Sequence, residues 1–159
     1  MRAIARKQPL LSLEEWAHLD EDAEGELVDG ILQEEEVATA LHEIVVRWLL
    51  VTLSLWARTR RAQVFGSELK IATGVRRGRK PDVSVFMAEL PHLTDPLVRE
   101  RPLLVVEVLS PRPSDARRDR VEKVREYAQA GIRHHWIVDP QLRTFEMLRL
   151  ERGAYMHST

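Results

Sequence analysis

The chain has 159 residues, of which 44% are hydrophobic and 31% are charged, and its net charge is -1 at pH 7. This length and composition fit one folded domain over residues 1–159 and exclude an intrinsically disordered chain. The absence of cysteine excludes disulfides, thiolate metal sites and cysteine nucleophiles, and the six histidines form no HExxH pair for zinc.

No segment is long and apolar enough to predict a membrane span. The longest apolar stretch, Ile44 to Ala57, is shorter than the roughly 20 residues that cross a bilayer, and it contains Arg47. The basic N-terminus is not followed by the apolar core of a signal peptide. We therefore expect a cytoplasmic protein without membrane contact.

The N-terminal region, about residues 12–36, is acidic and contains no Lys or Arg. Ser12 and Glu15 match a capping box, which predicts a short helix. Residues 26–32 predict a small hairpin with Asp29-Gly30 at its turn. Basic clusters follow at 58–61, 76–80 and 112–120, so the near-neutral total does not exclude a polyanionic partner.

A long helix is predicted at about Val37 to Thr59, at the start of a core that extends to about residue 150. Apolar residues recur along one side at helical spacing, and further apolar residues lie on the opposite side. A helix that is apolar nearly all round is buried on more than one side. We therefore expect this helix to contact a second layer or a second subunit, which suggests a homodimer.

Strands and one further helix are predicted in the second half of the chain. Residues 63–71, 82–86 and 103–109 predict three strands, with a basic loop at 74–80. A helix from Ser114 to Ala130, ended by Gly131, precedes two more strands at 136–140 and 144–150. This order indicates an α/β fold with a mixed central sheet flanked by helices. The tryptophans are expected in the core: Trp16, Trp48, Trp56 and Trp136.

Two carboxylates lie at the ends of predicted core strands. Glu107 interrupts the apolar run at 103–109, where a buried carboxylate is usually matched by a cation or a metal. Asp82 opens the strand before it. If the two strands are neighbours, both carboxylates and the carbonyl oxygen of Val108 would suit Mg²⁺. The alternative is that Asp82 caps a turn while Glu107 pairs with an arginine.

A lysine near such a metal would position the attacking water and stabilise the developing charge. Asp119, Lys123 and Tyr127 recur every four residues on the second predicted helix and so share one face. The alternative for these three is a solvated ion pair capped by a tyrosine. Lys70 and Lys80 are the other lysines near predicted strands, and Lys80 is the better candidate for a phosphate contact.

Several short motifs occur together along the chain. They are Pro81-Asp82, Glu107-Val108-Leu109-Ser110-Pro111, Asp119-x-x-x-Lys123-x-x-x-Tyr127, Ala130-Gly131 and Trp136-Ile137-Val138-Asp139, with Glu26-x-x-Asp29-Gly30 and His42 nearer the N-terminus. Their joint order and spacing resemble the Uma-type family of restriction endonuclease-like proteins, within the PD-(D/E)XK nuclease superfamily, from about Leu13 to Tyr155. The resemblance implies a restriction-endonuclease-like fold with a core of helix, three strands, helix and strand.

The resemblance also implies residue roles. Asp82 and Glu107 would bind Mg²⁺, for which Mn²⁺ would substitute, with Glu26 as a further ligand and Lys123 as the catalytic lysine. The lysine that the family carries two residues after the glutamate is Leu109 here, so the role would have moved to the helix. Further candidate accessory residues are His42, Tyr127 and Ser110.

The implied activity is divalent-metal-dependent endonucleolytic hydrolysis of DNA, and cutting two strands would suit a homodimer. Candidate phosphate contacts directly precede Asp82: Arg76, Arg77, Arg79 and Lys80. One alternative is a catalytically silent nuclease-fold module that binds nucleic acid or protein, which a cleavage assay would separate. The other is a structural homo-oligomer whose buried acids pair with arginines, which would show no specific affinity for Mg²⁺ or Mn²⁺.

Overall fold

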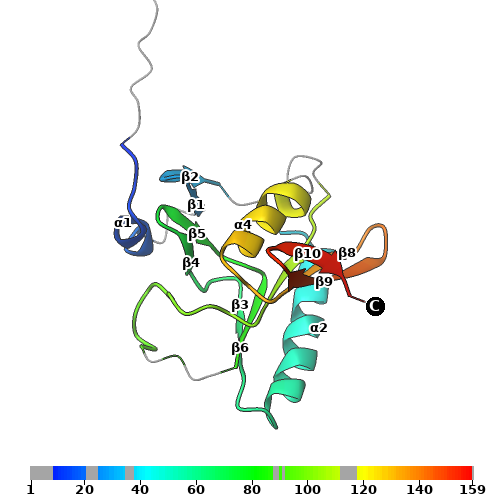
Figure 1. The fold of residues 1–159 in the computed structure, drawn as a ribbon. Coiled ribbons are helices and arrows are strands. Elements are labelled where there is room, and N and C mark those ends of the chain that lie inside the picture. Colours follow the sequence, from blue (N-terminus) through cyan, green and yellow to red (C-terminus); the bar gives the residue numbers. More distant parts are fainter. Residues whose placement is uncertain are drawn as a thin grey trace, which may run out of the picture.

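A six-stranded mixed sheet lies at the centre of the computed structural model (Figure 1). The structure describes residues 9–20, 25–34, 38–87, 90, 92–111 and 118–158. Its strands are β3 (Gln63–Gly66), β6 (Val83–Phe86), β7 (Leu104–Val108), β8 (His134–Asp139), β9 (Thr144–Glu151) and β10 (Ala154–His157). They follow the order β10-β9-β8-β7-β6-β3, and among these described strands only β7 and β8 run parallel. The predicted α/β fold with a mixed sheet is confirmed.

Helices cover both faces of this sheet (Figure 1). On one face, Val46 and Leu49 of α2 (Ala40–Ala57) pack with the valines of β6 and β7. On the other face, Tyr127 of α4 (Val124–Gln129) packs against Val105. Because alternate residues of a strand point to opposite faces, β7 contributes to both layers.

A smaller antiparallel sheet, in the order β2-β1-β5-β4, lies beside the first. It contains β1 (Glu26–Val28), β2 (Ile31–Gln33), β4 (Ile71–Gly74) and β5 (Arg77–Arg79). Asp29 and Gly30 take φ values of 52° and 82°, as the predicted two-residue turn requires. The predicted capping box begins α1 (Leu13–Ala17), which packs Trp16 so closely on Gly78 that a Cβ atom there would come within 2.2 Å of the indole.

Several predicted boundaries are wrong. The strand expected at 63–71 is two strands, β3 and β4, in different sheets, because a turn at 67–68 redirects the chain. The basic loop expected at 74–80 is a short turn followed by β5, which pairs with β1 and β4. No sequence pattern predicted β10, which pairs with β9. Trp48 and Trp56 are exposed on α2 and do not lie in the core.

Candidate active site

Asp82 and Glu107 lie on neighbouring antiparallel segments. The sequence pattern predicted a shared metal site only if the strands of these two residues were neighbours, and they are. Val83 of β6 pairs with Val106 of β7, so the residues just outside this pair lie at the same end of the two strands. The Asp82 carboxylate accepts a hydrogen bond from the backbone amide of Val108 (2.7 Å). This bond holds Asp82 against the end of β7 that carries Glu107.

Both oxygens of the buried Glu107 carboxylate accept hydrogen bonds from side chains of the helical region at residues 118–129. The Lys123 ammonium donates to Oε2 (2.8 Å), and the Tyr127 hydroxyl donates to Oε1 (2.6 Å). Burial raises the pKa of Tyr127 well above its usual value, and the negative charges of Glu107 and Glu26 raise it further. The phenol therefore stays protonated and remains a donor to Glu107.

A π-helical segment, η1 (Arg118–Lys123), leads directly into α4 and ends on Lys123. Wide turns of this kind are frequently found at functional sites. Within the described residues, the expected helix is therefore π-helical from Arg118 to Lys123 and α-helical only after that, although Lys123 and Tyr127 still meet on one carboxylate. The Asp119 side chain and residues 112–117 lie outside the described part of the chain.

Glu26 of β1 links this group to the smaller sheet. Its carboxylate lies 3.4 Å from the Lys123 ammonium and accepts hydrogen bonds from Arg79 (2.9 Å) and from the backbone amide of Lys80 (3.0 Å). Burial alone would raise the pKa of Glu26, but the charges of Lys123 and Arg79 and these hydrogen bonds lower it below its usual value. Glu26 is therefore held as a carboxylate by protein cations.

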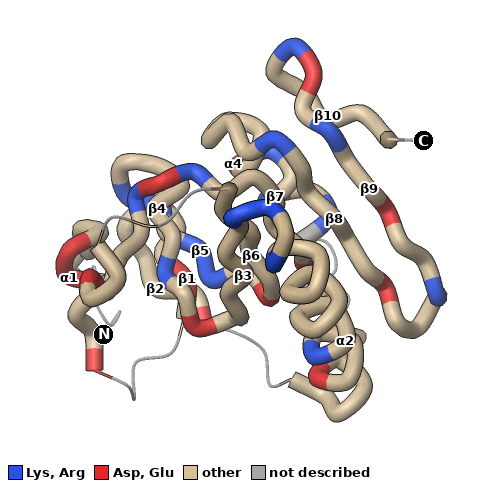
Figure 2. Tube along the Cα trace, turned by 90° about the horizontal axis from the view of Figure 1, so that it is seen from below, with Lys and Arg blue, Asp and Glu red and all other residues tan. Residues whose placement is uncertain are grey.

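Arg79 is a structural cation in this arrangement, and its assignment as a DNA contact is wrong. Its side chain is 1% exposed and lies between two acids, Glu26 and Glu126, with 2.5 Å between its Nη2 and Glu126 Oε2. Thr73 of β4 also donates to Glu126. Figure 2 shows acidic and basic residues close together around β1 and β5. No sequence pattern indicated Glu126, which reaches Arg79 only because α4 packs beside the smaller sheet.

The other three predicted phosphate contacts differ in exposure. Arg76 is exposed in the β4–β5 turn. Arg77 pairs with the exposed Asp29 (2.7 Å), and the ammonium of Lys80 lies 3.4 Å from Glu68. A cavity of about 510 Å³ borders this region, lined by Asp29, Thr73, Gly74, Val75, Arg76, Arg77, Glu126 and Gln129.

His42, at the start of α2, lies beside Asp82. Its Nε2 atom is 3.2 Å from Asp82 Oδ1, and its backbone amide donates to the N-cap residue Thr39 (3.2 Å). Burial lowers the pKa of His42, but the hydrogen bond to Asp82 and the charge of that carboxylate outweigh burial and raise the pKa overall. Ser110, the remaining accessory candidate, is partly buried just beyond β7.

A second buried histidine, His135 of β8, lies behind Tyr127. Its ring meets the tyrosine ring edge-on at 5.1 Å between centroids, and neither ring nitrogen has a hydrogen-bond partner among the described residues. Burial lowers the pKa of His135 to about 3, and the positive charge of Lys123 adds to this effect. His135 is therefore neutral at ordinary pH.

The chemistry of the donor set fits a magnesium ion held by two carboxylates. Mg²⁺ is commonly held by one or two carboxylates, with water and phosphate oxygens completing its octahedron. An ionised carboxylate offers about four acceptor positions on its two oxygens, so a carboxylate that accepts hydrogen bonds from the protein can also bind a metal ion. No cluster of three or more acidic or histidine side chains that could hold a metal occurs within the described part of the chain. Water and substrate would therefore have to supply most ligands.

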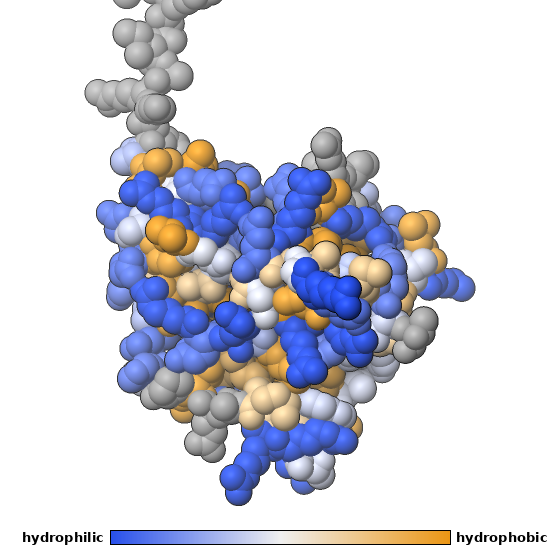
Figure 3. Space-filling model, viewed as in Figure 1, coloured by the Kyte–Doolittle hydropathy of each residue, from blue (hydrophilic) through white to orange (hydrophobic). Residues whose placement is uncertain are grey.

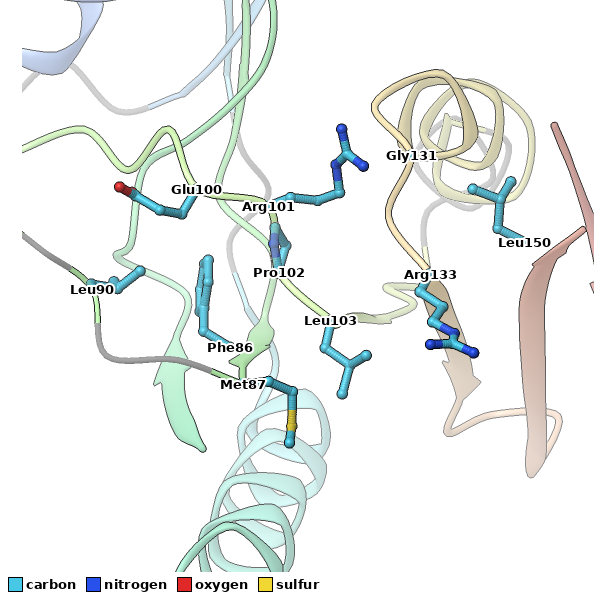
Figure 4. Close-up of a pocket in the computed structure, with 10 residues that line it drawn as sticks. All are labelled: Phe86, Met87, Leu90, Glu100, Arg101, Pro102, Leu103, Gly131, Arg133 and Leu150. Atoms are coloured by element: carbon cyan, nitrogen blue, oxygen red, sulfur yellow. The ribbon is translucent and has the colours of Figure 1, made fainter. Parts of the chain in front are cut away.

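A separate cavity of about 500 Å³ lies at the opposite end of β6 and β7. It includes Phe86, the last residue of β6, and Leu103, which directly precedes β7 (Figure 4). The Arg101 side chain, which lines this cavity, extends towards Gly131 in Figure 4. Because Asp82 and Glu107 lie at the other end of the strand pair, this cavity is not part of the candidate active site.

Comparisons with known proteins agree with this architecture. The model of the Uma2 family, described as "Putative restriction endonuclease", matches residues 11–159. A solved structure described as "a putative nuclease belonging to DUF820", from Anabaena variabilis ATCC 29413, is similar over 92% of this chain and 83% of that chain. Its TM-score is 0.75 and its sequence identity is 20%, which shows a shared fold. No curated protein matches the chain.

Proposed function

Because the chain belongs to the Uma2 family, we propose that it is an endonuclease that hydrolyses phosphodiester bonds in DNA with a divalent metal ion. The observation that carries this proposal is the contact of Glu107 with Lys123 at the strand end where Asp82 lies. A pair of carboxylates with an adjacent lysine has the parts that metal-assisted hydrolysis requires.

Asp82 and Glu107 would hold the ion, which we expect to be Mg²⁺ with Mn²⁺ as a substitute, and the carbonyl oxygen of Val108 would add a third donor. A divalent ion bound there would lower the pKa of a water and offset charge on the scissile phosphate. Lys123 would orient the attacking water and donate to the developing negative charge. The hydrogen bond from Tyr127 would keep Glu107 in place.

Glu26 would serve a different purpose from the metal ligand that the resemblance implied. Since Arg79, Lys123 and the amide of Lys80 already surround its carboxylate, we propose that Glu26 positions the Lys123 ammonium. Asp82 also lies beside His42, which would orient the Asp82 carboxylate from the side of α2.

DNA would reach the site past the exposed turn between β4 and β5. We propose that Arg76 and Arg77 contact backbone phosphates there, since phosphate contacts position DNA through Arg and Lys side chains. Lys80, whose ammonium lies near Glu68, would add positive charge beside them. The protein would act in the cytoplasm as a homodimer.

Cleavage assays on two substituted proteins test the proposal. Asp82→Asn and Glu107→Gln should each abolish Mn²⁺-dependent cleavage of plasmid DNA and weaken Mn²⁺ binding measured by calorimetry. Glu151→Gln on β9 is the matched control, because Glu151 pairs with Arg149 at the far side of the sheet. Full cleavage by either site variant would refute the assignment.

A catalytically silent DNA-binding module is the second candidate. It is favoured by the fact that both oxygens of Glu107 already have protein partners. DNA binding by the wild type, with no cleavage under any divalent ion and no Mn²⁺ binding, would establish this second function.

A further inference from the structure

The helix α2 exposes a row of large apolar side chains on the side opposite the core. Its buried face is formed by Val46, Leu49, Leu53 and Ala57. The outward residues, named here the α2 stripe, are Leu41, Ile44, Trp48, Val51 and Leu55, with exposures from 48% to 60%. Scattered exposed apolar residues are normal, but a continuous row of this size marks an interaction site.

The spacing of the α2 stripe is that of a helix–helix seam. Its members alternate three and four residues apart, so at about 100° per residue they fall within one narrow sector of the helix. This repeat is the one by which two helices pack their apolar seams together. The charged residues Glu43 and Arg47 are exposed on α2 outside this row, so the stripe itself carries no charge.

The sheet face beside α2 adds further apolar surface. Phe145 of β9 pairs with Val138, and Met147 pairs with Trp136, so these side chains lie on the face of the sheet on which α2 packs. Phe145 and Met147, named here the β9 flank, are 42% and 40% exposed. Figure 2 shows β8 and β9 extending beyond α2 on this face. By contrast, hydrophilic side chains cover much of the surface seen in Figure 3.

We infer that the α2 stripe and the β9 flank form an interface with a second copy of this chain, with the two α2 helices antiparallel about a two-fold axis near Trp48. Leu41 and Leu55 are each seven residues from Trp48, so this axis brings Leu41 against Leu55 of the partner subunit. The arrangement also places opposite ends of the two helix dipoles together. A self-complementary patch centred on one residue is what a two-fold interface requires.

The area of the patch suits a dimer. Half-exposed side chains of this size offer on the order of 100 Å² each, so seven of them approach the roughly 800 Å² per partner of a stable interface. Trp48 at the centre matches the position at which tryptophan contributes most binding energy. This inference does not depend on the nuclease activity, because it rests on α2 and β9 alone.

A membrane is a weaker candidate for this surface. Among the described helices, α2 is long and apolar enough by length and composition to cross a bilayer, although the sequence pattern predicted no membrane span. However, Val46, Leu49 and Leu53 are packed into the core against the sheet, and Glu43 and Arg47 lie along the helix. Inserting α2 would therefore expose the core of the fold and bury charges, whereas a second copy covers the stripe without disturbing either.

Sedimentation equilibrium of the full chain from about 1 to 100 μM tests this interface. The wild type should have twice the 18.4 kDa chain mass, and Trp48→Glu should raise the dimer dissociation constant at least about 100-fold. Leu55→Glu, at an exposed site that the fold does not need, should do the same. Leu93→Glu is the matched control, because Leu93 is 70% exposed in the loop between β6 and β7, and it should stay dimeric.

Circular dichroism and urea midpoints should show that all three variants are folded. A wild type that is monomeric at 100 μM would overturn the inference, as would a dimer that persists in both α2 variants. A monomer that binds vesicles of mixed neutral and anionic lipid, and loses this binding in Trp48→Glu, would also overturn it and assign the surface to a membrane.

Discussion

Replacing Lys123 by methionine should destabilise the fold, because it removes the cation from a buried group of acids. The ammonium lies 2.8 Å from Glu107 and 3.4 Å from Glu26, and none of the three residues is more than 5% exposed. Breaking a buried ion pair by removing one partner costs about 3–5 kcal/mol. Because Glu26 keeps its contact with Arg79, we expect a free-energy cost at the lower end of this range, about 3 kcal/mol.

A double-mutant cycle that combines Lys123→Met with Glu107→Gln measures the coupling energy between these two side chains. Because the double variant lacks both charges, it should recover at least about 1.5 kcal/mol relative to the sum of the single variants. Urea unfolding at neutral pH, followed by circular dichroism, gives the four free energies of unfolding. The exposed pair Arg149 and Glu151 on β9 is the control, and a cycle on it should give a coupling below about 1 kcal/mol.

A second substitution of Lys123 tests whether this residue positions the attacking water or binds a DNA phosphate. Lys123→Arg keeps the charge but replaces a compact donor with a planar fork, so the single-turnover cleavage rate should fall at least about tenfold while DNA affinity is retained. Lost DNA affinity in Lys123→Arg with an unchanged cleavage rate would instead make Lys123 a phosphate contact.

The stability measurements have their own refuting outcome. If Lys123→Met lowers the free energy of unfolding by less than about 1 kcal/mol, or if the effects of Lys123→Met and Glu107→Gln are strictly additive, the structural reasoning is wrong.

Four further outcomes follow from individual residues. Arg79→Met should cost about 3–5 kcal/mol in urea unfolding, whereas Arg76→Ala should leave stability unchanged and reduce the slope of log affinity for DNA against log salt by about 1. Gly78→Ala should lower the unfolding midpoint sharply, because its Cβ atom would overlap the Trp16 ring. His135 titrates at about 3 when folded and near 6.5 when unfolded, so the unfolded state binds its proton more readily and stability falls with pH below 6.5. The loss should reach about 2 kcal/mol near pH 5, and His135→Phe should remove it.

The local patterns of the sequence predicted the parts of the fold that depend on neighbouring residues. The capping box at Ser12 and the Asp29-Gly30 turn form as expected, because each needs only a few residues and a definite backbone conformation. Glu107 also has the buried partners that an acid in an apolar strand requires. Lys123 and Tyr127 reach it from one side despite the π-helical segment before α4.

Contacts between distant segments could not be predicted in this way. Arg79 looks like part of a solvated basic cluster, yet its acidic partners lie 53 and 47 residues away in sequence. Only the pairing of the short β5 with β1, and the packing of α4 beside them, brings these charges together. The splitting of residues 63–71 between two sheets is likewise decided by long-range pairing, since both halves have ordinary strand composition.

These long-range contacts join the two sheets through one buried row of alternating charges. In order they are Glu126, Arg79, Glu26, Lys123 and Glu107, each in contact with the next. Each interior member has an opposite charge on both sides, and these contacts offset the free-energy cost of removing its charge from water. The row reaches Glu107 at the strand end where Asp82 adds a second carboxylate, so the candidate metal site adjoins it. Loss of the Arg79 charge would therefore act on Lys123 through Glu26.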